Sequence, residues 1–81
     1  MMRPVQLRMA RAALNWTVRD LEGRSEVGRN TISRYEAGND ILASSLEKLE
    51  KVLTDEGIVF FDGDRSYGIG AGLNKRQRSK R

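Results

Sequence analysis

A chain of 81 residues has room for one compact hydrophobic core, and its 15 basic and 11 acidic side chains give a formal charge of +4. Cysteine and histidine are both absent, which excludes disulfides, thiolate or imidazole metal sites and histidine general bases, so we expect no metal, no cofactor and no enzyme activity. No apolar run approaches the ~20 residues that cross a bilayer, and the N-terminus lacks the apolar stretch of a signal peptide. The sequence therefore predicts a cytoplasmic protein without membrane contact.

The charges are divided into three blocks. Residues 1–38 contain seven arginines and four acids, residues 39–64 two lysines and seven acids, and residues 65–81 six basic residues and no acid. Basic groups gathered at both ends can neutralise the phosphates of a polyanion while the acidic middle faces away. The distribution favours a nucleic acid as partner, although a solvated basic tail without a partner accounts equally well for residues 75–81.

The first expected helix begins near Pro4, which suits a first helical turn. Leu7, Ala10 and Leu14 follow at helical spacing and share one face. Because asparagine tolerates the left-handed conformation that ends a helix, we expect Asn15 to end this one.

A short second helix is expected after Thr17. Thr17 and Asp20 form a capping pair at its start, Leu21 anchors it, and the charged stretch around Gly23 predicts an end near Ser25.

The third expected helix follows Gly28 and includes residues 29–36. Ile32 and Tyr35 share its inward face, so the polar residues between them face solvent or a partner. Gly38 can adopt the positive φ that ends this helix.

The fourth expected helix has the most regular apolar stripe in the chain. Ser44 and Glu47 predict a capping box, Glu47 faces Lys51 one turn on, and Gly57 ends the helix. The stripe contains Leu46, Leu49, Val52 and Leu53.

Residues 58–61 read as a strand closed by the turn at residues 62–64. Pairing with residues 67–73 is doubtful because glycine alternates through them and weakens strands, so the strand is left without an obvious partner in the chain. Residues 75–81 are almost wholly charged and are expected to be disordered when free.

Two short helices joined by a tight turn, the second with a polar face near its N-terminus, have the geometry that places a helix in the DNA major groove. Residues 17–36 have this arrangement. Leu21, Val27 and Ile32 are spaced to pack between the two helices and fix their crossing angle.

On these residues the chain resembles the Cro/repressor helix-turn-helix family over about residues 5–53. Residues 53–61 are also similar to small bacterial members that carry a C-terminal strand. The resemblance implies a mainly α, four-helix domain over residues 1–57, a strand or hairpin extension over 58–73 that could contact a second subunit, and a basic tail over 74–81. The residues that carry it are Gln6-Leu7-Arg8, Arg11, Trp16-Thr17, Leu21, Val27, Thr31-Ile32-Ser33-Arg34-Tyr35-Glu36 and Gly38.

The resemblance also implies a function: a nucleoid-associated transcriptional regulator, most simply a repressor, that binds double-stranded DNA as a homodimer. Arginine suits guanine, asparagine suits adenine, and the hydroxyls suit phosphate or a thymine methyl. The implied DNA-binding residues are Arg29, Asn30, Thr31, Ser33, Arg34 and Thr17.

Other family positions have structural roles. Arg11 and Glu36 match positions that form a semi-buried ion pair in some members. Trp16, Leu21 and Tyr35 are expected to belong to the core rather than to contact a ligand.

The chain departs from the family pattern at three positions. Val18 stands where relatives usually have a phosphate-binding glutamine, Glu22 where they have alanine, and Glu26 where they have the turn glycine. The carboxylate of Glu22 must either point outward or find a cation such as Arg19 or Arg24.

Two other classes of function are alternatives to DNA binding. A protein-interaction module, such as an antitoxin or antirepressor with a small protein partner, would use the acidic middle and an exposed strand edge at residues 58–61. An enzyme is disfavoured because Asp62 and Asp64 lack the other ligands of a cation loop, and no helix pattern follows the glycines of residues 68–72.

Overall fold

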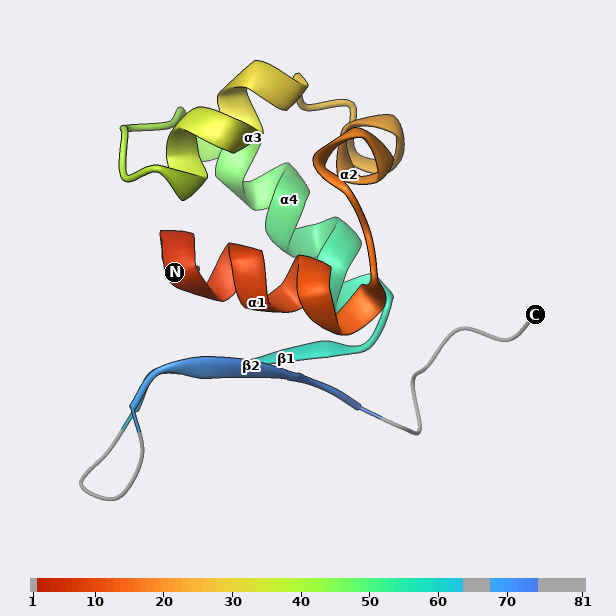
Figure 1. Ribbon diagram of the computed structural model, residues 1–81, viewed down its shortest axis with the longest axis vertical. Coiled ribbons are helices and arrows are strands. Elements are labelled where there is room, and N and C mark those ends of the chain that lie inside the picture. Colours follow the sequence, from red (N-terminus) through yellow and green to blue (C-terminus); the bar gives the residue numbers. More distant parts are fainter. Residues whose placement is uncertain (1, 64–67, 75–81) are drawn as a thin grey trace.

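The computed structural model describes residues 2–63 and 68–74 of the chain. Within these residues it consists of helices followed by one antiparallel pair of strands, so the predicted mainly helical fold with a C-terminal hairpin is confirmed (Figure 1). The elements are α1 Pro4–Leu14, α2 Val18–Ser25, α3 Arg29–Glu36, α4 Ala43–Asp55, β1 Ile58–Phe61 and β2 Gly70–Leu73. None of the described helices is both long and apolar enough to cross a membrane. The predicted tail at residues 75–81 lies outside the described part of the chain.

The ends of the first two helices are set by local side-chain chemistry, as predicted. Asn15 closes α1 with a φ of 59° and a ψ of 40°, the left-handed conformation that asparagine tolerates. At the start of α2, the backbone N–H of Asp20 donates to the Thr17 hydroxyl at 3.1 Å, and the Thr17 N–H donates to the Asp20 carboxylate at 2.9 Å. This capping box satisfies two N–H groups that the helix itself leaves without partners.

The predicted capping box of α4 is wrong. The helix begins at Ala43 with Leu42 as its N-cap, and no side chain caps it. Ser44 is therefore already inside the first turn, where its hydroxyl cannot take the N-cap geometry. Lys51 pairs with Asp55, its other neighbour on the same helix face, at 3.3 Å.

The core lies between the four helices and β1. Its buried apolar side chains come from every helix and from Met2, a residue for which the sequence predicted no role. Met2 is held in place by its backbone, because its N–H donates to Glu50 at 2.8 Å and its carbonyl accepts from the Tyr35 hydroxyl. The buried apolar residues are Met2, Leu7, Ala10, Leu21, Val27, Ile32, Leu46, Leu49, Leu53 and Ile58.

Two predictions about the C-terminal strands are wrong: that residues 67–73 are doubtful as a second strand, and that β1 has no obvious partner in the chain. β1 and β2 pair from Ile58 opposite Leu73 to Phe61 opposite Gly70. The glycines of β2 are compensated by the Phe61 ring, since a β-carbon placed on Gly70 or Gly72 would lie 3.7 or 3.6 Å from it. Cross-strand packing thus supplies what the glycines lack.

Gln6 ties this hairpin to α1. Its buried side-chain amide donates to the carbonyls of Phe61 at 2.7 Å and Gly70 at 3.1 Å, and its oxygen accepts from the Arg3 N–H at 2.8 Å. Figure 1 shows the hairpin running along α1, on the opposite side of that helix from α2 and α3. The helix-turn-helix face is therefore left open.

Candidate nucleic-acid interface

Helices α2 and α3 are joined as the sequence predicted. Leu21 of α2, Val27 of the connecting turn and Ile32 of α3 are all buried in one cluster between the helices. Because each position is enclosed, the crossing of the two helices is fixed by close packing rather than by the turn alone.

The turn itself is closed by polar contacts. The Ser25 hydroxyl donates to the Leu21 carbonyl at 2.7 Å and accepts from the Val27 N–H at 3.1 Å. Glu26 adopts a φ of 63°, the left-handed conformation that glycine takes without strain, and its N–H donates to the Glu22 carbonyl at 2.8 Å. A glutamate costs about 1–2 kcal/mol more than glycine in this conformation, and the packed helices hold it there.

The outer face of α3 is polar and open. Arg29, Asn30, Ser33 and Arg34 are all exposed, while Ile32 on the opposite side is buried. Residues three or four positions apart lie on the same side of a helix, as Arg29 and Ser33 do. Asn30 has the same relation to Ser33 and to Arg34, so the four exposed side chains form one surface. The structure thus brings together four of the six predicted DNA-binding residues. Two of their side chains are cations, and the other two are neutral hydrogen-bonding groups.

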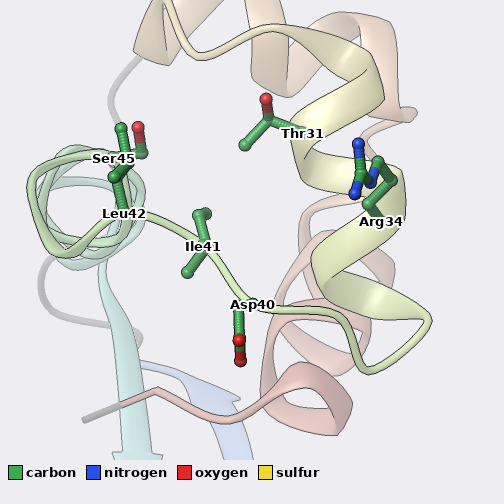
Figure 2. Close-up of a pocket in the computed structure, with 6 residues that line it drawn as sticks. All are labelled: Thr31, Arg34, Asp40, Ile41, Leu42 and Ser45. Atoms are coloured by element: carbon green, nitrogen blue, oxygen red, sulfur yellow. The ribbon is translucent and has the colours of Figure 1, made fainter.

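The fifth residue, Thr31, lies at the edge of this surface. It is half-buried and lines a hollow of about 210 Å³ between α3 and the start of α4 (Figure 2). Thr31 faces the loop across this hollow, and Arg34 lies one turn further along the same helix. The other lining residues are Asp40, Ile41, Leu42 and Ser45.

The sixth residue, Thr17, stands on a different element, at the N-terminus of α2. Its hydroxyl oxygen accepts the Asp20 N–H at 3.1 Å and so caps the first turn of α2. The hydrogen bond from the Thr17 backbone, followed by that from its side chain, lowers the pKa of the exposed Asp20 carboxyl.

Arg11 and Glu36 form a two-pronged ion pair between α1 and the end of α3. Nε and Nη2 of Arg11 donate to the two carboxylate oxygens at 2.7 and 2.8 Å, and Nη1 donates to the Trp16 carbonyl at 3.0 Å. The side chains are only 20% and 10% exposed. Hydrogen bonding to Glu36 raises the pKa of Arg11, and burial opposes this change. The contact fixes the end of α3 on the body of the protein.

The exposed carboxylate of Glu22 has a backbone partner rather than a side-chain cation. Its Oε2 accepts the backbone N–H of Arg29, the first residue of α3, at 3.1 Å. Arg24 is engaged elsewhere, 4.5 Å from the centre of the Trp16 ring and 3.6 Å from Glu56. The sequence predicted solvent or a side-chain cation as the surroundings of this carboxylate, and not a backbone N–H. The missed signal was Gly28, which starts α3 without a side chain that could cap it.

A family model described as helix-turn-helix matches residues 7–54, more than half of the chain. No curated protein and no solved structure matches the chain.

Proposed function

Because the chain belongs to the helix-turn-helix family of DNA-binding regulators, of the Cro/repressor type, we propose that α3 reads the major groove of double-stranded DNA. The observation that carries the proposal is the outer face of α3, where four polar side chains are exposed together on a helix anchored by buried Ile32. A helix of this kind fits the width of the major groove.

Each side chain on this face has a chemically suitable partner in DNA. Arg29 and Arg34 can each donate two hydrogen bonds to one guanine, and Asn30 can pair with the N6 and N7 groups of adenine. Ser33 and Thr31 suit phosphate oxygens or a thymine methyl group. Thr17 lies at the N-terminus of α2, a place where a backbone phosphate can bind.

We further propose that the protein acts as a repressor. Its proposed location is the cytoplasm, where it would be bound to the chromosome. Occupying a site at a promoter is sufficient to block transcription, and the α3 surface provides the contacts needed for occupancy. Activation would require a further surface for the transcription machinery.

Two copies are proposed to act together, because one α3 helix reaches only a half-site. The hairpin offers a surface for this contact, since Val59 is 38% and Phe61 52% exposed on β1. Light scattering over a range of concentrations tests the proposal. A monomer both free and on DNA would refute it.

The same exposed hairpin residues favour one alternative function, a protein-interaction module such as an antitoxin or antirepressor. In that case the hairpin would bind a small protein partner. This alternative would be supported if a second small protein co-purified with the wild-type chain and did not co-purify with the Phe61→Lys variant.

Selection of duplexes from a randomised pool tests the DNA-binding proposal directly. We expect an enriched sequence with two related half-sites about one helical turn, or ~10 base pairs, apart. Failure to enrich any sequence, together with no binding to duplexes at low salt, would overturn major-groove reading by α3.

A further inference from the structure

The N-terminus of α3 has no cap from its own sequence. Gly28 is the N-cap and has no side chain, and the first turn of the helix contains no acid. The leading N–H groups of a helix need partners from outside it, and they carry partial positive charge. Here the first of them, that of Arg29, donates to a carboxylate oxygen of Glu22 on the preceding helix.

The backbone of Glu22 is held in place by α2. It follows buried Leu21 in α2, its side chain is half-buried, and its carbonyl accepts the N–H of Glu26 that closes the helix. A hydrogen bond to an ionised carboxylate is roughly twice as strong as one between neutral groups. The contact therefore links the body of the domain to the first residue of the proposed reading helix.

We propose that Glu22 is a positioning residue that sets the sequence specificity of α3, an inference that rests on the proposed function. By holding the Arg29 backbone, it fixes where Arg29 and Asn30 leave the helix and so which base edges they reach. It also occupies the place where a DNA phosphate would otherwise bind the N-terminus of α3. Both effects favour base contacts over contacts to the DNA backbone.

The test compares Glu22→Ala with Glu26→Ala, a matched control that removes the same charge from an exposed acid one helical turn further along the chain. Affinity is measured for the duplex selected by the wild-type protein and for a scrambled duplex of equal length. Glu22→Ala is expected to lower the ratio of the two affinities by about fivefold, which is equivalent to the roughly 1 kcal/mol of stability that a helix cap contributes. Glu26→Ala should shift both affinities together and leave their ratio unchanged.

Two more variants separate geometry from charge. Glu22→Gln retains an oxygen acceptor and should keep most of the specificity. Glu22→Asp retains the charge on a shorter side chain and should lose specificity as the alanine variant does. This aspartate variant also carries the test if Glu22→Ala does not fold.

Hydrogen exchange of the Arg29 amide gives a readout that needs no DNA. We expect faster exchange in Glu22→Ala and wild-type exchange in Glu26→Ala. Faster exchange with an unchanged affinity ratio would mean that Glu22 only caps the helix. Unchanged exchange would mean that the contact between Glu22 and the Arg29 amide does not form in solution. Either result would overturn the role of Glu22 in specificity and leave the proposed function standing. A wild-type protein that does not distinguish the two duplexes would overturn the proposed function together with it.

Discussion

Replacement of Arg11 by alanine should destabilise the fold far more than the loss of an ordinary surface arginine. Arg11 donates to both oxygens of Glu36 and to the Trp16 carbonyl, so three hydrogen bonds are lost at once. The Glu36 carboxylate, only 10% exposed, would remain poorly hydrated and without its cation.

The magnitude follows from the burial of the pair. Breaking a fully buried ion pair costs about 3–5 kcal/mol because the remaining charge is uncompensated. Arg11 is 20% exposed, so water can partly replace it, and we expect a loss of about 2–3 kcal/mol. With a urea dependence of roughly 1 kcal/mol per molar for so small a domain, the unfolding midpoint should fall by about 2–3 M.

A double-mutant cycle with Glu36→Ala tests this reasoning by urea unfolding at fixed protein concentration, followed by circular dichroism. The double variant should lose less stability than the sum of the single losses, because it leaves no unpaired charge. Lys51 and Asp55, 76% and 64% exposed, form the control pair, with a coupling below about 0.5 kcal/mol. Additive losses at Arg11 and Glu36, within about 0.5 kcal/mol, would refute the assigned role.

Three further predictions concern DNA binding and pH. Asn30→Ala should cost about 1–3 kcal/mol on the selected duplex and relax one base position in a repeated selection, and unchanged specificity would argue against base contact. Deleting residues 75–81, which contain five basic groups, should weaken binding to all duplexes and flatten the salt dependence in titrations; an unaltered salt slope would exclude phosphate contacts by this segment. Asp20→Asn should be less stable than wild type above pH ~4, and the difference should shrink at lower pH. The reason is that the pKa of Asp20 is lowered in the folded state, so its contacts stabilise the fold only while the carboxyl is ionised. Urea midpoints between pH 6 and 2 check this prediction, and a difference that stays constant with pH would contradict it.

The sequence by itself was sufficient for the helices and for the joint between α2 and α3. Their determinants are local: apolar residues at helical spacing, the Thr17 and Asp20 capping pair, and Asn15 at a helix end. The outward direction of Asn30 follows in the same way, because burying Ile32 two positions later turns it toward solvent.

Only the tertiary structure decided the contacts between residues far apart in the chain. The strand at residues 70–73 looks weak alone because of its glycines. It forms because Phe61 covers these glycines and because Gln6, 64 positions before Gly70, binds the end of the strand. Glu22 likewise has no local reason to cap α3; its carboxylate reaches Arg29 because packing brings α2 and α3 together. Local pattern specifies which segments form helices, whereas the partners of buried and capping groups depend on how those segments pack.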